Sequence, residues 1–107
     1  MKKAKTRIMI CQPMSGKTEA EIMAVRDAAV MKIAEEYGEG RFIIADTYKP
    51  ENYEKHDGLW CIGKALQEMS RCDVVYFCEG WNRYRGCLVE YVAAGAYKRK
   101  IIIEGQK

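Results

Sequence analysis

Three polar segments of the sequence carry side chains that could bind or react with a small molecule. They run from Gln12 to Lys17, from Asp46 to Asp57 and from Glu79 to Glu90. Each follows a short apolar run of the kind that forms a buried β-strand. Because ligands of open α/β sheets bind at the carboxyl ends of the strands, we expect these segments to meet at one site if the strands are parallel.

The first segment has the features of a turn that leads from a strand into a helix. Backbone N–H groups and the helix dipole at such a turn attract an anion. Gly16 would allow a ligand to come close, and Lys17 adds a positive charge. The spacing of a Walker phosphate-binding loop is absent. Two interpretations stay open, an anion-binding loop and an ordinary turn capped by Thr18. The candidate residues are Gln12, Pro13, Met14, Ser15, Gly16 and Lys17.

The third segment is rich in groups that contact a nucleobase or a phosphate. Trp81 and Tyr84 could stack on a planar base and the arginines could pair with phosphate, although loop aromatics also cover core edges. Glu90 follows Gly86 by four residues, and helical side chains lean toward the N-terminus, so the carboxylate would point back at a site where Gly86 leaves room. Alternatively, Glu90 is a solvated partner of the helix dipole. The candidates are Glu79, Gly80, Trp81, Tyr84, Arg85, Gly86 and Glu90.

Cysteine and metal chemistry fit the sequence less well. The chain has five cysteines without a C-x-x-C pair and a single histidine, His56. This pattern matches neither a disulfide framework nor a zinc site, so we expect a reducing cytoplasmic location and no metal. A reaction at this site that uses Glu90 would need a second acidic group. Asp46 and Glu79, which follow strands, are the carboxylates best placed to supply it.

Alternating strands and helices must position these loops. Continuous apolar runs at 8–11, 42–45, 74–78 and 101–103 predict strands covered on both faces. Between them, apolar spacing and a capping box at Thr18 predict three helices. The order βαβαβαβ predicts an α/β fold, a single domain over residues 1–107 with a small three-layer, flavodoxin-like or Rossmann-like parallel sheet of about four strands.

Each predicted helix has one face that we expect to be buried. On the first helix this face carries Ile22, Val25, Ala29, Ile33 and Tyr37; on the second it carries Leu59, Ile62, Leu66 and Met69; on the third it carries Val89, Val92, Ala93 and Ala96. The long polar connection from Asp46 to His56 would hang over the site and could act as a lid.

The net charge of +3 places few limits on partners. Basic residues precede the first and last strands, opposite to the expected ligand edge, so a nucleic-acid partner is not favoured and these residues are read as solvated. These residues are Lys2, Lys3, Lys5, Arg7, Lys98, Arg99 and Lys100. No run is long enough to cross a membrane. The edges of a small sheet need protection, so we expect a homo-oligomer that covers one helical face.

Three motifs together resemble a known group of proteins. They are Gln-Pro-Met-Ser-Gly-Lys at 12–17 after a strand, Ser-Arg-Cys-Asp-Val-Val-Tyr-Phe at 70–77, and Gly-Trp-x-x-x-Arg-Gly-Cys-x-x-Glu at 80–90. They look like a small family of uncharacterised bacterial and phage proteins that is similar to nucleoside 2-deoxyribosyltransferases and deoxynucleoside 5′-monophosphate N-glycosidases. The resemblance covers nearly the whole chain. It implies a flavodoxin-like fold, a nucleoside or nucleotide as ligand, no metal or cofactor, and Glu90 as the nucleophile.

The sequence also departs from that group. Ala65 stands where the relatives have a helical aspartate, Met9 replaces a tyrosine of the first strand, and Tyr84 replaces a serine or aspartate. The leading hypothesis is an N-glycosidase or transferase, since a carboxylate can stabilise or capture an oxocarbenium-like state. The alternatives are a nucleotide or nucleotide-signal binding module without turnover, and a structural protein with an empty crevice.

Overall fold

The computed structural model of the protein describes residues 5–106. Lys2 and Lys3 of the predicted basic cluster lie outside them. In chain order the elements are β1 (Thr6–Cys11), α1 (Glu19–Tyr37), β2 (Phe42–Ile44), α2 (Pro50–Lys55), α3 (Gly58–Met69), β3 (Val74–Phe77), the short 3-10 helix η1 (Trp81–Arg83), α4 (Arg85–Ala96) and β4 (Lys100–Ile103).

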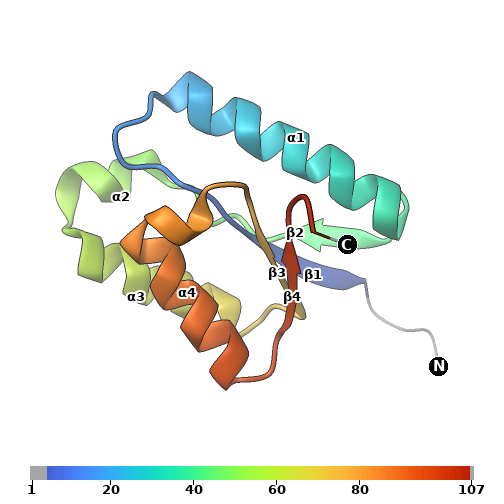
Figure 1. Cartoon of the computed structure of the whole chain (residues 1–107). Helices are drawn as coiled ribbons and strands as arrows, with labels where there is room; N and C mark the ends of the chain where they lie inside the picture. Colours follow the sequence, from blue (N-terminus) through green and yellow to red (C-terminus); the bar gives the residue numbers. More distant parts are fainter. Residues whose placement is uncertain (1–4, 107) are drawn as a thin grey trace.

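The four strands form one parallel sheet in the order β2-β1-β3-β4, with α1 on one face and α3 and α4 on the other (Figure 1). The predicted α/β, flavodoxin-like architecture is therefore confirmed. The chain moves from β1 to β2 by way of α1 and returns to β3 on the opposite side of β1. Ligands of such sheets bind at this reversal, outside the carboxyl ends of β1 and β3.

The core has two layers because successive strand residues point to opposite faces. Met9 and Cys11 of β1, with Val75 and Phe77 of β3, face α3 and α4. The alternate residues of these strands, together with Ala29 and Ile33 of α1, form the second layer; they are Ile8, Ile10, Val74 and Tyr76. Met9, which replaces a tyrosine of the resembling group, is thus a buried core residue, 1% exposed.

Helix α1 begins as the sequence predicts and buries most of the predicted face, since Ile22, Ala29 and Ile33 are buried and Tyr37 packs against the core. The Thr18 hydroxyl accepts a hydrogen bond from the Glu21 N–H at 3.1 Å, and the Glu21 carboxylate accepts one from the Thr18 N–H at 2.8 Å, which completes the capping box. The prediction for Val25 is wrong, since its side chain is 37% exposed and the neighbouring Arg26 is buried instead. A hydrophobic pattern cannot anticipate a buried guanidinium whose hydrogen bonds come from distant segments.

Most of the predicted face of the third helix is wrong, although Ala93 packs against the core as expected. Helix α4 buries Cys87, Glu90 and Ala94, and it exposes Val89 and Val92. Nearly every residue of α4 is apolar, so the sequence pattern does not define one face. In α3, Met69 is buried and Leu66 packs against the core, whereas Leu59 in the first turn is 81% exposed.

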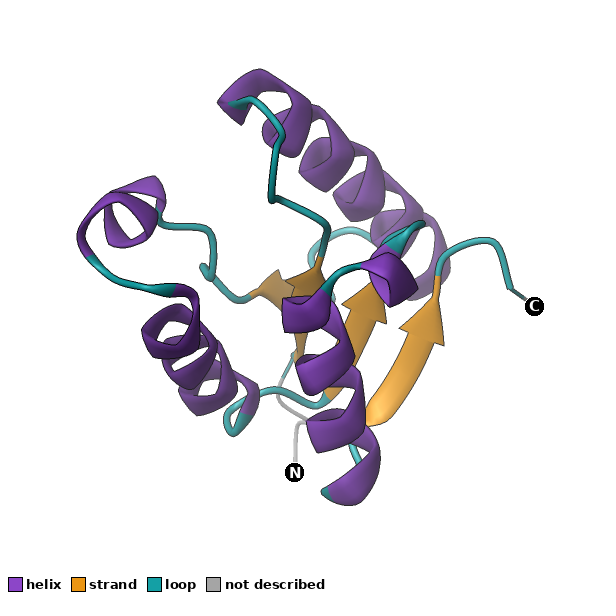
Figure 2. Ribbon diagram, turned by 60° about the vertical axis from the view of Figure 1, so that its left-hand side comes forward, coloured by secondary structure: helices purple, strands orange, loops and turns teal. Residues whose placement is uncertain are grey.

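The connection between β2 and α3 contains a helix that the sequence pattern did not predict. This helix, α2, has no buried residue. Figure 2 shows that it lies beyond the carboxyl end of the sheet, separated from the other helices by loops on both sides. No helix between residues 5 and 106 has the length and apolar character needed to cross a membrane.

Candidate functional site

Glu90 lies on the inner side of α4, and its side chain is enclosed near the carboxyl end of β1. The residue is only 8% exposed. Burial raises the pKa of this carboxyl from an ordinary 4.5 to about 7, because the charged form loses its hydration. The neighbouring Cys11 thiol acts in the opposite direction as a weak hydrogen-bond donor to the carboxylate. At neutral pH Glu90 is therefore poised between its two protonation states.

The thiols around Glu90 are neutral. Burial, followed by the charge of Glu90, raises the pKa of Cys11 well above 9.0 and that of Cys87 to about 12. Burial also raises the pKa of Cys78 to about 12. A cysteine nucleophile needs a thiolate, so these residues are core side chains and cysteine catalysis is disfavoured.

Tyr53 of α2 is a further group close enough to Glu90 to feel its charge, and the sequence pattern did not point to it; its side chain is 44% exposed. Burial raises the pKa of its phenol to about 12, and the charges of Cys61 and Glu90 act in the same direction. The phenol thus keeps its proton and can donate a hydrogen bond. The sequence held no clear signal for it, because Tyr53 stands in a polar segment with no periodic pattern.

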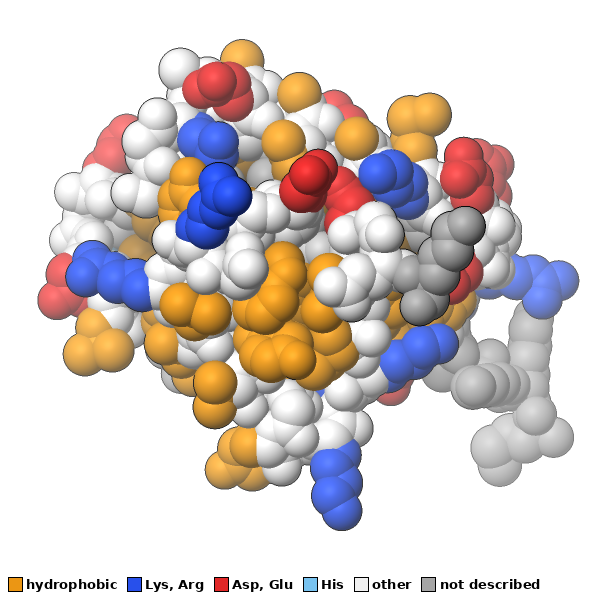
Figure 3. Space-filling view, viewed as in Figure 1, with side chains coloured by type: hydrophobic (Ala, Val, Ile, Leu, Met, Phe, Trp, Pro, Cys, Tyr) orange, Lys and Arg blue, Asp and Glu red, His pale blue; other side chains and the backbone are white. Residues whose placement is uncertain are grey.

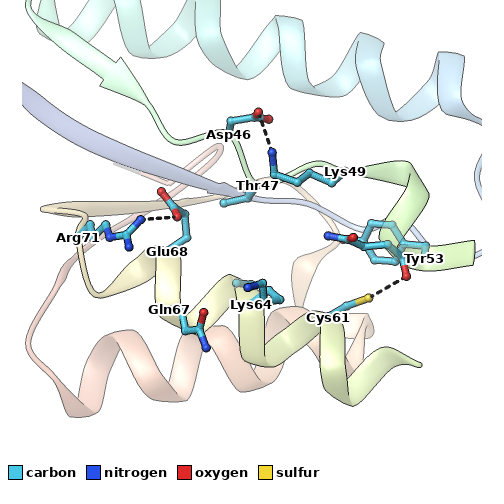
Figure 4. A pocket seen from close by; sticks show the side chains of 11 residues that line it. Asp46, Thr47, Lys49, Tyr53, Cys61, Lys64, Gln67, Glu68 and Arg71 are labelled. Carbon is cyan, nitrogen blue, oxygen red and sulfur yellow. Dashed lines mark hydrogen bonds and ion pairs between the residues drawn. The ribbon is translucent and has the colours of Figure 1, made fainter. Parts of the chain in front are cut away.

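A groove of about 170 Å³ opens beside Tyr53, between α3 and the segment that contains α2 (Figure 4). Ligand pockets usually measure about 300–1,000 Å³, so the groove would hold only part of a nucleoside unless α2 moves. Ala65 lines it, and Asp46 is the only lining residue among the candidates from the sequence. The full lining consists of Asp46, Thr47, Lys49, Asn52, Tyr53, Cys61, Lys64, Ala65, Gln67, Glu68 and Arg71.

Ion pairs occupy several charged groups of the groove. Lys49 contacts Asp46 at 3.1 Å, and Arg71 contacts Glu68 at 3.3 Å (Figure 4). The Lys64 ammonium lies 5.7 Å from the centre of the Trp60 ring, which in turn stacks on His56. Asp46 is therefore already engaged by a cation, which weakens its case as a replacement acid.

Gln12 is a structural residue in this geometry. Its side chain is 3% exposed, its amide N–H donates to the Ile22 carbonyl at 2.9 Å, and its amide oxygen accepts from Arg26 at 3.1 Å. Arg26 also donates to the Ala45 carbonyl at 3.1 Å and to the Thr47 hydroxyl at 3.2 Å. Gln12 and Arg26 thus join α1 to the ends of β1 and β2, which leaves little of the Gln12 amide for a ligand.

The rest of the first loop forms a capped turn. Pro13 is buried and Met14 is half-buried, while Ser15 to Lys17 are exposed. The Lys17 N–H donates to the Met14 carbonyl at 3.1 Å, and Gly16 takes a positive φ of 79°. The first turn of α1 carries two acidic residues, Glu19 and Glu21, and their charge opposes an anion there. The geometry favours the capped turn, and anion binding stays a prediction.

In the third loop, Trp81 packs on the protein itself. Its ring stacks on Tyr91 with centroids 4.5 Å apart and lies 5.2 Å from Phe77. One face of the indole is therefore covered, and Trp81 does not line the groove. Tyr84 is half-buried and Glu79 is exposed.

The remaining candidates of this loop serve the packing of α4. A Cβ at Gly86 would lie 3.2 Å from Ile62, so this glycine allows α3 and α4 to approach closely. Gly80 has a positive φ of 86° and directly precedes η1. The Arg85 guanidinium lies near Gly58 at the start of α3, 3.6 Å from where a Cβ would stand. Of the third segment, only Glu90 thus presents a reactive group in an unusual environment.

A scan against protein-family models, a search of curated proteins and a search of solved structures found no match for this chain. The residues that the structure describes contain no group of three or more His, Cys, Asp or Glu side chains that could hold a metal ion.

Proposed function

We propose that the protein breaks the N-glycosidic bond of a nucleoside or 2′-deoxynucleotide, by hydrolysis or by transfer, with Glu90 as the nucleophile. The observation that carries the proposal is a carboxyl that is only 8% exposed at the reversal point of a parallel sheet; burial raises its pKa to about 7, and the Cys11 thiol is its neighbour. The residue motif around Glu90, which resembles that of the deoxyribosyltransferases, adds the substrate class.

The chemistry follows from a poorly hydrated carboxylate. As the bond between the sugar carbon C1′ and the base nitrogen breaks, its electron pair leaves with the base and positive charge develops on the sugar. The Glu90 carboxylate stabilises that charge and forms a bond to C1′. Water, or a second base, then attacks C1′ and restores the carboxylate.

Tyr53 is our candidate for the group that assists the departing base. The base needs a proton or a strong hydrogen bond as it leaves, and Tyr53 has a protonated phenol near Glu90. A ligand would enter by displacing α2, which has no buried residue and therefore loses little packing when it moves. Asp46 and Lys49 would then be at the rim of the opened site.

The second candidate function is nucleotide binding without turnover. One observation favours it: Ala65, an apolar residue, lines the groove at the position where the resembling enzymes have an aspartate. A chain that has lost this acid could retain a ligand without cleaving it.

The test is to incubate the protein with a panel of nucleosides and 5′-monophosphates and to measure free base by chromatography. We expect the wild type to release base and Glu90→Gln to lower the rate by at least about a thousandfold. Glu39→Gln, which changes an exposed carboxylate just before β2 at the opposite end of the sheet, should retain the wild-type rate. A Glu90→Gln rate equal to that of the wild type would contradict the proposal, and ligand binding without base release would support the binding module.

A further inference from the structure

Strand β4 leaves one edge of the sheet open. In the order β2-β1-β3-β4, it pairs with β3 on one side only (Figure 2). The N–H groups of Lys100 and Glu104 donate to carbonyls of the β3 side at 3.3 and 2.9 Å. Because backbone groups alternate along a strand, those of Ile101 and Ile103 point away from β3. The Ile103 carbonyl accepts from Gln106 at 3.1 Å and keeps a second lone pair.

This edge lacks the usual protection against pairing. Natural edge strands carry charges, prolines or bulges that prevent another strand from adding to them. Here three consecutive isoleucines, residues 101 to 103, form the edge. Charges stand only at its two ends, where Lys100 precedes the isoleucines and Glu104 follows them. An open edge of this kind accepts a further strand.

The segment from Lys100 to Glu104 is complementary to itself. In an antiparallel pair centred on Ile102, Lys100 of one chain lies opposite Glu104 of the other, and Ile101 lies opposite Ile103. The outward backbone groups belong to Ile101 and Ile103, so in this register each such pair exchanges two hydrogen bonds. The pairing therefore uses the outward backbone groups without a shift of the strand, and the Ile103 carbonyl accepts through its second lone pair while it keeps the bond from Gln106.

The two charged side chains lie on the same face of the sheet. Lys100 places its ammonium 5.7 Å from the ring centre of Tyr37, and Glu104 contacts Lys32 of α1 at 3.6 Å. Both side chains are thus on the α1 face, where an antiparallel partner would bring its Glu104 next to Lys100. Opposite charges at facing positions stabilise a strand pair, and like charges destabilise it.

The other face of the same edge continues into an apolar surface on α4. From Gly86 to Ala96 the only charged residue is Glu90, which is buried, whereas Leu88 and Val92 are 42% and 68% exposed. Tyr91 is 37% exposed as well. Figure 3 shows hydrophobic side chains gathered between α4 and β4. A partner sheet joined at β4 would bring its own α4 over this surface and remove apolar area from water.

We propose that β4 pairs with β4 of a second copy of this chain, antiparallel about a two-fold axis at Ile102, to form a dimer with a continuous sheet. The occupant is a second copy because the charge order and the backbone register are self-complementary. The surface does not include Glu90 or the groove, so the proposal stands apart from the proposed function.

The test is the molar mass in solution, measured by sedimentation over a range of protein concentrations. The wild type should have twice the 12.3 kDa of one chain. Lys100→Glu places two carboxylates opposite each other and should weaken the dimer at least about tenfold. The double variant Lys100→Glu with Glu104→Lys should restore it, because the opposite charges face each other again. Lys98→Glu, the same charge change outside the paired segment, should leave the dimer intact.

Far-ultraviolet circular dichroism would verify that each variant is folded. A wild type that stays monomeric at all concentrations would overturn the proposal. It would also be overturned by a dimer that Lys100→Glu does not weaken, or that the double variant does not restore, since the two β4 strands would then not pair in this register. Binding of an unrelated protein at β4 in place of a second copy would appear as a monomeric wild type and would count against it equally.

Discussion

Two buried ionisable side chains, Arg26 and Glu90, face the interior from helices on opposite faces of the sheet. Arg26 is 9% exposed and Glu90 is 8% exposed. The Arg26 guanidinium donates to three acceptors, an amide oxygen, a carbonyl and a hydroxyl. The Glu90 carboxyl has a single thiol to favour its charged form, and burial raises its pKa to about 7.

The difference separates a structural charge from a reactive one. Hydrogen bonds from the ends of β1 and β2 hold Arg26 in place, so its burial stabilises the connection between α1 and the sheet. Glu90 lacks a comparable set of hydrogen bonds. Above neutral pH its buried negative charge therefore lowers the stability of the folded chain. A buried group in a crevice whose pKa is strongly shifted is a candidate for action on a ligand.

The largest change in stability should come from removing Arg26, the buried charge that is held by three hydrogen bonds. Arg26→Met leaves two buried acceptors and a part-buried one, the Thr47 hydroxyl, without their donor; at about 1–3 kcal/mol for each buried acceptor, we expect a total loss of about 3–5 kcal/mol in the free energy of unfolding. Urea denaturation would measure it. Arg41→Met, at an exposed arginine, should change the stability by less than about 0.5 kcal/mol. Equal effects of the two variants would show that the Arg26 hydrogen bonds do not hold α1.

Replacing Glu90 by a neutral residue should raise the free energy of unfolding, whereas the Arg26 variant lowers it. Between pH 4.5 and about 7 the folded chain keeps the Glu90 proton while the unfolded chain releases it, so the stability falls as pH rises across that window. Glu90→Gln removes this loss and should stabilise the protein by up to about 3 kcal/mol above pH 7. Denaturation curves at pH 5 and pH 8 would measure it. A variant that is less stable than the wild type at pH 8 would contradict the account.

A smaller effect should follow from the thiol beside Glu90. Cys11→Ala removes a weak donor and should raise the Glu90 pKa by less than about one unit. Cys11→Ser supplies a stronger donor and should lower it. The two shifts, read from the pH dependence of stability, must have opposite directions. Shifts in the same direction would mean that Cys11 acts only through packing.

The sequence predicted the fold from local signals. Continuous apolar runs predicted a parallel sheet, and the Thr18 and Glu21 pair predicted the start of α1. The buried face of α4 was not predictable, because its apolar residues surround the helix. Arg26 was missed for a related reason, since its acceptors at Gln12, Ala45 and Thr47 come from distant segments.

The candidate site was predictable only in part. The position of Glu90 in the first turns of a helix was enough to predict that its carboxylate points toward the carboxyl edge of the sheet. The burial of Glu90 was not predictable, because it depends on how α4 packs against β1 and α3. The same holds for Tyr53, whose segment forms α2 only in the folded chain, and for Trp81, which packs on Tyr91.

The central claim, that Glu90 is a buried carboxyl held near the midpoint of its titration, can be measured directly. The carboxyl carbon of Glu90, labelled with ¹³C and assigned through Glu90→Gln, would be followed by nuclear magnetic resonance from pH 4 to pH 9. The account predicts a midpoint near pH 7. A midpoint near the ordinary value of 4.5 would mean that water reaches the carboxylate freely, and it would contradict the distinction drawn between Glu90 and Arg26.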